Sequence, residues 1–264
     1  MIELAAVIQG EGGLFRPVLS YGGGVNSTAL AILAVNEGWH GHIIFSDTGT
    51  EWPDTYCFMD VFERDWLAPR GLHIERLGAE WREKGHPEHL IDYCERVHVV
   101  PIGHRRWCTM EYKVKPLQAW CGVRGLSNDA DVMIGIAADE SWRMALANRP
   151  LVDRHIDRDG CVRIIQAEGL PVPRKSGCYI CPFQKDSQWR ELWTHHKDLF
   201  DRAERMEENA RRRRTSRRGG NPLVLDMAGK VTLAQRRVTY ETQTMLPEID
   251  MDELMEYRPC MCSL

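Results

Sequence analysis

Two cysteines separated by two residues, Cys178 and Cys181, are the residues whose type and spacing most directly suggest chemistry. A tight turn lets two such thiolates converge on one metal centre. Pro182 directly follows the second cysteine and favours a [4Fe–4S] cluster over Zn²⁺, while buried thiols without a metal are the alternative. Further ligands would be needed, and the candidates to supply them are Cys108, Cys260 and Cys262.

The chain has nine cysteines, an odd and high number for a sequence without a secretion signal. Disulfide frameworks are typical of secreted proteins with paired cysteines, so metal ligation or redox chemistry explains some of these residues better. The other cysteines are isolated or lie among apolar residues, and we expect them to be packing residues: Cys57, Cys94, Cys121 and Cys161.

A second candidate for chemistry is the stretch 20–28, where Gly22, Gly23 and Gly24 follow an apolar run and precede a helical pattern. Consecutive glycines allow positive φ and let a backbone approach a ligand closely. The start of a helix binds anions through free N–H groups and the helix dipole. The sequence therefore predicts a phosphate-binding turn, with an ordinary glycine-rich turn as the alternative. Its polar side chains could cap the helix or contact the ligand: Ser20, Asn26, Ser27 and Thr28.

Polar residues also follow two later apolar runs. Asp47 and Thr48 come shortly after the run 43–45, and Glu140 and Ser141 follow the run 132–137. Open α/β sheets bind ligands at the carboxyl ends of their strands, so we expect these residues near the glycine turn.

Alternating strand and helix patterns up to about residue 150 predict how these residues are positioned. We expect a doubly wound, mostly parallel α/β sheet with helices on both faces. Beyond Pro150 the pattern changes to a proline-containing loop and one long helix over residues 189–208. This predicts a nucleotide-binding domain over residues 1–150 and a smaller, mainly helical, cysteine-bearing region over residues 151–264. The expected strands are 16–19, 43–45, 72–77 and 132–137, and the expected helices include 27–37, one beginning at Pro53, and 110–120.

The composition is typical of a soluble globular protein, with 43% hydrophobic residues, 27% charged residues and a net charge of -4. No apolar run approaches the ~20 residues that cross a bilayer, and no signal peptide is evident, so we expect a cytoplasmic protein. The net charge gives no general attraction to nucleic acid. A local run of six arginines is either a solvated surface or a contact for the phosphate backbone of RNA or DNA. These are Arg211, Arg212, Arg213, Arg214, Arg217 and Arg218.

Four stretches, in family order, resemble one known group of proteins. Residues 20–28 resemble the pyrophosphate loop of the adenine-nucleotide alpha-hydrolase (PP-loop) group. Residues 45–49, with Pro53, are similar to the second-strand motif of the phosphoadenosine phosphosulfate (PAPS) reductase family. Residues 134–143 resemble its later strand motif, where a Glu-Ser pair and an arginine follow the strand. Residues 176–183 are similar to the cysteine knuckle of its iron–sulfur or metal-bearing branch.

This resemblance implies a site for ATP, or for PAPS or adenylyl sulfate as the nucleotide substrate. The backbone at 22–24 and the nearby hydroxyls would hold the phosphates, and Asp47 would lie near the nucleotide. The resemblance also implies that Lys113 and Arg143 stabilise negative charge on the phosphates.

The sequence departs from the family at two points. Asn26 stands where many members have aspartate, and an amide supplies no negative charge for a bound Mg²⁺. The C-terminal Glu-Cys-Gly-His signature, which carries the nucleophilic cysteine of sulfonucleotide reductases, is missing. The only late cysteines are Cys260 and Cys262, in a different context.

Three functions are therefore open. The first is an ATP-using enzyme that couples adenylation to sulfur transfer or modification on a nucleic acid, with a cysteine-ligated metal centre. The second is a thiol-dependent reductase of phosphoadenylyl or adenylyl sulfate. The third is a module that binds the nucleotide without turning it over. The missing signature counts against the second function, and Asn26 leaves the third open.

Overall fold

A computed structural model describes residues 15–82, 89–103, 105–128, 130–142, 148–215, 224–226 and 231–244 of the chain. Within these ranges four short apolar segments pair as parallel strands in the order β3-β2-β1-β4. The first three strands of the chain are neighbours in the sheet, with β1 in the middle of the sheet and β3 at one edge. The last strand, β4, pairs with the free side of β1 and forms the other edge. The strands are β1 (Val18–Ser20), β2 (His42–Ser46), β3 (Ile74–Leu77) and β4 (Val132–Ile134).

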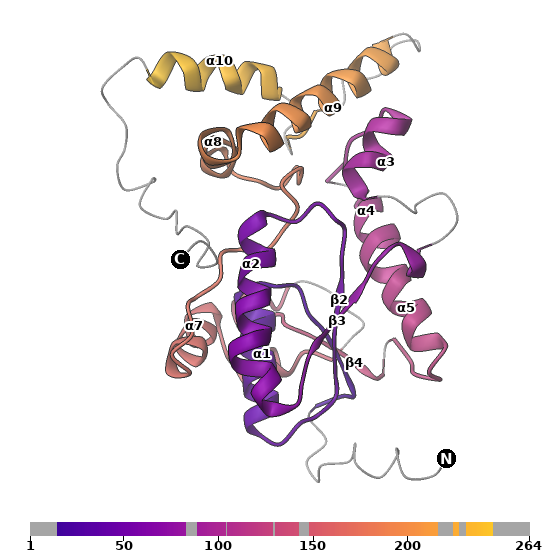
Figure 1. Cartoon of the computed structure of the whole chain (residues 1–264), viewed down its shortest axis with the longest axis vertical. Helices are drawn as coiled ribbons and strands as arrows, with labels where there is room; N and C mark the ends of the chain where they lie inside the picture. Colours follow the sequence, from indigo (N-terminus) through magenta and orange to yellow (C-terminus); the bar gives the residue numbers. More distant parts are fainter. Residues whose placement is uncertain are drawn as a thin grey trace.

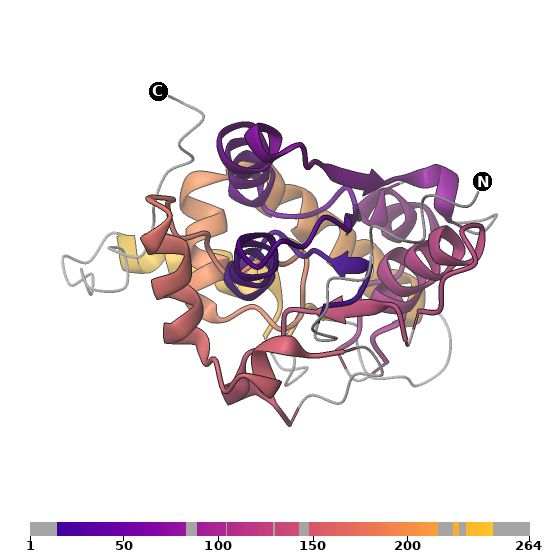
Figure 2. The ribbon, with the colours of Figure 1, turned by 90° about the horizontal axis from the view of Figure 1, so that it is seen from below.

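Helices cover both faces of this sheet. Figure 1 shows α1, α2 and α7 on one side and α5 on the other, with α8, α9 and α10 beyond one end, and Figure 2 shows the molecule from below. The predicted α/β fold with a parallel sheet and a helical C-terminal region is confirmed. The α-helices are α1 (Val25–Asn36), α2 (Pro53–Phe62), α3 (Leu90–Val97), α4 (Trp107–Thr109), α5 (Lys115–Gly122), α6 (Pro150–Asp153), α7 (Arg158–Ala167), α8 (Asp186–His195), α9 (Lys197–Thr215) and α10 (Leu233–Thr244). Shorter 3₁₀ turns are η2 (Ala68–Arg70), η3 (Ala79–Trp81) and η5 (Ala138–Glu140).

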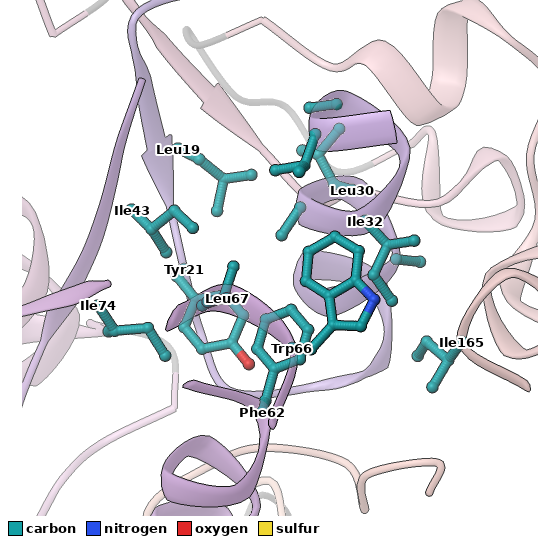
Figure 3. Close-up of a cluster of buried hydrophobic side chains, with 14 of the residues drawn as sticks. Leu19, Tyr21, Leu30, Ile32, Ile43, Phe62, Trp66, Leu67, Ile74 and Ile165 are labelled. Carbon is teal, nitrogen blue, oxygen red and sulfur yellow. The ribbon is translucent and has the colours of Figure 1, made fainter. Parts of the chain in front are cut away.

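Both faces of the sheet are buried in apolar layers, which explains why the strands are apolar runs rather than alternating ones. Leu19 and Ile43 pack into the cluster under α1 and α2 (Figure 3). Their neighbours Val18 and Ile44 pack on the opposite face against Trp120 of α5. This is the alternation that a strand requires, since successive side chains point to opposite faces.

Residues 107–122 form one continuous helical stretch that positions Lys113. A π-helical turn, η4 (Met110–Val114), lies between α4 and α5, and a second one, η1 (Glu63–Leu67), extends α2. Wide turns of this kind are frequent at functional sites. The helix expected over residues 110–120 is confirmed.

The single helix expected over residues 189–208 is wrong, because two helices cover this range. The α8 helix ends at His195, and the backbone of His196 (φ -136, ψ 57) is not helical. Leu192 and Phe200, on either side of the break, are both fully buried in the same cluster, so their spacing does not reveal it. The α9 helix then continues to Thr215, so the first part of the arginine run is helical.

The apolar clusters join both parts of the chain. Leu151 and Ile165 belong to the cluster under α1, while Trp52 and Tyr112 are buried with residues of the C-terminal helices. The division at residue 150 therefore stays a prediction. None of the helices in the described ranges is long and apolar enough to span a bilayer.

Candidate functional site

Hydrogen bonds within the glycine turn between β1 and α1 fix its conformation. The backbone N–H of Gly22 donates to Ser27 Oγ (3.1 Å), and Ser27 Oγ donates to the carbonyl of Gly24 (3.1 Å). Gly23 has a φ of 69°, a left-handed conformation that favours glycine. A Cβ at Gly23 would also lie 2.6 Å from Thr55 Cγ2, so α2 closely supports the turn.

Helix α1 begins at Val25, two residues earlier than the sequence pattern suggests. Its N-cap is Gly24, which has no side chain to accept a hydrogen bond, so the expectation that Asn26, Ser27 or Thr28 caps the helix is wrong. The first turn contains no acidic residue. Backbone N–H groups at such an uncapped start have no intrahelical partner and can bind an anion.

Two of the predicted ligand-binding hydroxyls have partners within the protein. Thr28 is fully buried, and its Oγ1 lies 3.0 Å from the hydroxyl of Tyr21. Figure 3 shows the Tyr21 ring with its hydroxyl oxygen in red. Ser27 is 8% exposed and shapes the turn, as described above. Ser20 is the last residue of β1 and opens the turn. The anion-binding groups that the turn offers are therefore chiefly backbone N–H groups.

Gly135, just after β4, lies close to the start of α1 and was not recognised in the sequence. A Cβ at this position would lie 2.6 Å from the backbone nitrogen and 2.7 Å from the Cα of Ser27. Only glycine lets the carboxyl end of β4 come this near to the helix. Because β1 and β4 are neighbours while the chain continues from β1 to β2, this is the point where open α/β sheets bind ligands.

Asn26 connects three elements at the start of α1. Its Nδ2 donates to Oε2 of Glu140 in η5 (3.3 Å), and its Oδ1 lies 3.4 Å from the donor Nη1 of Arg158 in α7. The structure thus brings the predicted residues Asn26 and Glu140 together and adds Arg158, which the sequence gave no reason to select. The neighbouring Ser141 is exposed, and its carbonyl accepts a hydrogen bond from Arg149.

Asp47 follows β2, at the edge of the sheet where the glycine turn lies. Its Oδ1 accepts hydrogen bonds from the backbone N–H of Gly49 (2.7 Å) and the hydroxyl of Tyr56 (2.6 Å), and its carbonyl accepts one from Arg82. Burial, and the bond to the Asp47 carboxylate, raise the pKa of Tyr56, so this phenol stays a donor. The contacts fix the turn after β2 and hold the carboxylate in place.

A buried glutamate joins Lys113 to the cysteine turn. Glu51 has no exposed side-chain area, and its Oε1 lies 2.7 Å from Lys113 Nζ. The same oxygen accepts from Thr48 Oγ1 (3.2 Å) and from the Cys178 thiol (3.6 Å), while Oε2 has no hydrogen-bond partner among the residues that the structure describes. Burial alone would lower the pKa of Lys113, but the neighbouring Glu51 raises it overall. Lys113, predicted to contact phosphates, is thus paired with a carboxylate that the sequence analysis did not select.

The cysteine turn packs directly on the glycine turn. A Cβ on Gly24 would lie 2.6 Å from Ser176 Oγ and 3.1 Å from Ser176 Cβ. Residues 51 and 178 form an antiparallel bridge, and the N–H of Cys181 donates to the carbonyl of Cys178 (3.0 Å) in a tight turn. Stretches more than 120 residues apart in the chain therefore form one site.

The described cysteines do not complete the predicted metal centre. Burial raises the pKa of the Cys178, Cys181 and Cys108 thiols. The nearby Cys108 raises the pKa of Cys181 further. Yet the described residues include no group of three or more His, Cys, Asp or Glu side chains arranged to hold a metal ion. Cys94, Cys121 and Cys161 are buried free thiols, in line with packing roles, whereas Cys57 is disulfide-bonded, so a packing thiol there is wrong.

Several predicted residues cannot be placed in this site. Arg143, Cys260 and Cys262 lie outside the described residues, as do Arg217 and Arg218, and only the backbone of Arg214 is described. Within the described part of the arginine run, Arg212 pairs with Glu208 (2.6 Å), and Arg213 donates to the carbonyl of Val97.

A parallel sheet with a glycine turn and a helix start at its switch point is the arrangement in which open α/β proteins bind ligands. Residues 16–141 match the model of the phosphoadenosine phosphosulfate reductase domain family. The chain is also similar to the crystal structure of a phosphoadenylyl-sulfate (PAPS) reductase from Candida auris in a phosphate complex. The identity is 17%, the TM-score is 0.44, and the likeness covers 62% of this chain and 82% of that one. No curated protein matches the sequence.

Proposed function

We propose that the chain binds ATP or a related adenine nucleotide through the glycine turn and uses it for sulfur chemistry beside the Cys178–Cys181 turn. The packing of Ser176 on Gly24 carries this proposal, because it joins the phosphate-binding backbone to the cysteines in one site. The free N–H groups and dipole of α1 favour the negative charge of the phosphates. The match of residues 16–141 to the phosphoadenosine phosphosulfate reductase domain supports an adenine nucleotide as the ligand.

The reaction we propose is adenylation-coupled sulfur transfer. An acceptor attacks the α-phosphate of ATP, pyrophosphate leaves, and sulfur then displaces the adenylate from the acceptor. Backbone donors fixed in the turn stabilise the charge that develops on the phosphate oxygens. The proposed acceptor is a nucleic acid, on the basis of the arginine run that begins on α9.

The competing function is thiol-dependent reduction of phosphoadenylyl or adenylyl sulfate, which needs a thiolate as the attacking group. Burial and the nearby Glu51 carboxylate raise the pKa of Cys178 well above its ordinary value. Its thiol therefore keeps its proton at neutral pH in this arrangement and is a weak nucleophile.

One set of assays tests the proposed function. The full chain is incubated with ATP, with and without RNA or DNA and a sulfur donor, and pyrophosphate release is measured. Parallel reactions contain phosphoadenylyl sulfate and a thiol, and sulfite is measured. Pyrophosphate release that depends on nucleic acid supports the proposal. Sulfite release supports the reductase instead, and nucleotide binding without either product supports a binding module.

Two alanine variants show whether the product arises at this site. Gly24→Ala adds a methyl group against Ser176 and is expected to abolish product formation. Gly177→Ala is the matched control, since a Cβ there meets nothing within 4 Å, and it should retain activity. Equal activity of both variants would show that the reaction occurs elsewhere.

A further inference from the structure

Two helices from distant parts of the sequence, α1 and α7, begin side by side at the glycine turn. Asn26 near the start of α1 meets Arg158 at the start of α7, and Asn36 at the end of α1 donates to Glu168 just after α7 (2.8 Å). The starts of the two helices therefore lie close together, and so do their ends. Cys161 and Ile165 of α7 are fully buried against the cluster that contains α1. This packing fixes the start of α7 next to the start of α1.

Arg158 is the first residue of α7, and no carboxylate in the described part of the chain forms an ion pair with its guanidinium. Its one side-chain hydrogen bond within the described residues is the long contact of 3.4 Å to Asn26 Oδ1. Other partly buried arginines are paired much more firmly: Arg174, Arg202 and Arg237 each contact two carboxylates. Arg158 is therefore positioned at the turn, and Asn26 is the only side chain among the described residues that accepts a hydrogen bond from its guanidinium.

The surroundings of Arg158 favour an additional negative charge. The start of α1 has neither a side-chain cap nor an acidic residue in its first turn. The start of α7 is capped by Asp157, whose carboxylate accepts the N–H of Gly160 (2.7 Å). A cation at the first position of a helix opposes the helix dipole, and Arg158 lies beside two such helix starts. Two carboxylates lie near Arg158 and accept other donors than its guanidinium: Glu140 Oε2 accepts the amide of Asn26 (3.3 Å), and Asp139 Oδ1 accepts the backbone N–H of Arg158 (3.1 Å).

We propose that Arg158 binds a phosphate group of the adenine nucleotide held at the glycine turn, and thereby gives the site its preference for phosphorylated ligands. This inference rests on the proposed function, because it assumes that the turn binds a nucleotide. The guanidinium presents several N–H donors in a planar fork that matches phosphate oxygens. The long bond to Asn26 costs little to exchange for a charged partner, so Asn26 orients Arg158 without competing with the ligand.

The test measures the dissociation constants of ATP, AMP and adenosine for the full chain. Arg158→Gln is expected to weaken ATP binding by about 10- to 100-fold, the usual effect of losing a charge-assisted hydrogen bond, and to leave adenosine binding unchanged. Arg158→Lys should recover part of the loss. The matched control is Arg163→Gln, an exposed arginine on the same helix, which should bind ATP like the wild type.

A second measurement needs no variant and therefore does not depend on the folding of one. Wild-type protein is treated with phenylglyoxal, which modifies arginines, and the modified residues are identified by mass spectrometry. ATP should protect Arg158, adenosine should not, and neither should protect Arg163. Unchanged ATP affinity of a folded Arg158→Gln variant, or modification of Arg158 that ATP does not slow, would overturn the inference while nucleotide binding stands. Absence of nucleotide binding by the wild type would instead overturn the proposed function, and the inference with it.

Discussion

The ammonium group of Lys113 lies 2.7 Å from a carboxylate oxygen of Glu51, whose side chain has no exposed area. This contact changes what the lysine is expected to do. The lysine that the sequence predicts to contact phosphates compensates a buried negative charge and holds the π-helical turn of residues 110–114 against the segment after β2. Because the same Glu51 oxygen also contacts Cys178, the pair determines the charge around the cysteine turn.

We therefore expect Lys113→Met to destabilise the protein by about 3 kcal/mol, since it leaves the Glu51 carboxylate buried without a cation. Urea unfolding of wild type and variant measures this change. The control is the double variant Glu51→Gln/Lys113→Met, which removes both charges and should recover a large part of the loss. A Lys113→Met variant with unchanged stability but weaker ATP binding would restore the role that the sequence suggested.

The approach of β4 to α1 gives the second prediction. Gly135→Ala places a methyl group 2.6 Å from the backbone nitrogen of Ser27, and a helix backbone cannot move aside as a flexible side chain can. We expect a loss of about 1–3 kcal/mol in unfolding free energy, with weaker nucleotide binding because the start of α1 is displaced. Thermal melting and ATP titration measure the two effects.

The matched control for Gly135 is Gly122→Ala, at the end of α5, where an added Cβ meets nothing within 4 Å. Alanine is the better helix former, so this variant should be as stable as the wild type or more stable by up to about 1 kcal/mol. If Gly135→Ala were as stable as this control and bound ATP like the wild type, the close packing of β4 on α1 would not require glycine at position 135.

The sequence predicts the fold well where local signals suffice. The glycine turn, its strand and its helix are visible because apolar periodicity and glycines change over a few residues. The break at His196 is not visible, because Leu192 and Phe200 keep facing one core on both sides of it. Buried positions contributed by two separate helices can mimic the spacing of one.

The candidate site is less predictable, because its members come from distant segments. Glu51 looks like a surface residue in the sequence, and only the bridge to Cys178 and the contact with Lys113 show that it is buried. Gly135 and Arg158 matter through their approach to α1, more than 100 residues away in the chain. A strand motif or a spacing rule contains no information about such contacts.

Asn26 provides the third prediction. In the wild type the Asn26 amide donates to Oε2 of Glu140 (3.3 Å). Asn26→Asp replaces this amide with a second carboxylate beside Glu140. Repulsion between this charge and the phosphates should weaken ATP binding in EDTA by about tenfold, and Mg²⁺ should restore affinity because the new carboxylate can share the ion with the phosphates. Wild-type ATP binding should change less on addition of EDTA, since an amide supplies no charge for the metal. Isothermal titration with and without Mg²⁺ measures both.

Asn36→Asp is the matched control for this prediction. It is the same substitution in the same helix and also lies next to a carboxylate, Glu168, but at the far end of α1 from the glycine turn. Its ATP affinity should show no new dependence on Mg²⁺. A Mg²⁺ response of equal size in both variants would mean that the ion does not act at the turn.

The fourth prediction concerns Glu207 of α9, which holds two later segments of the chain. Its side chain is buried, with hydrogen bonds from the backbone N–H groups of Leu225 (2.6 Å) and Leu233 (2.8 Å). Burial raises the pKa of this carboxyl above its ordinary value of 4.5, although the two N–H donors, and then Arg211 and Arg236, act in the opposite direction. The folded protein therefore holds this proton more tightly than the unfolded chain does.

The contribution of this shift to stability is fully present below about pH 4.5 and is lost as the pH rises through the folded-state pKa of Glu207. The glutamine of Glu207→Gln cannot ionise, so the variant does not lose stability through this group as the pH rises. The unfolding free energy of the wild type relative to the variant should therefore fall between pH 4 and pH 7. Urea unfolding at each pH measures the difference, and Glu208→Gln, on the same helix, controls for the removal of one negative charge. A difference that stays constant or grows with pH would show that the two backbone N–H groups outweigh burial and that the Glu207 pKa is not raised.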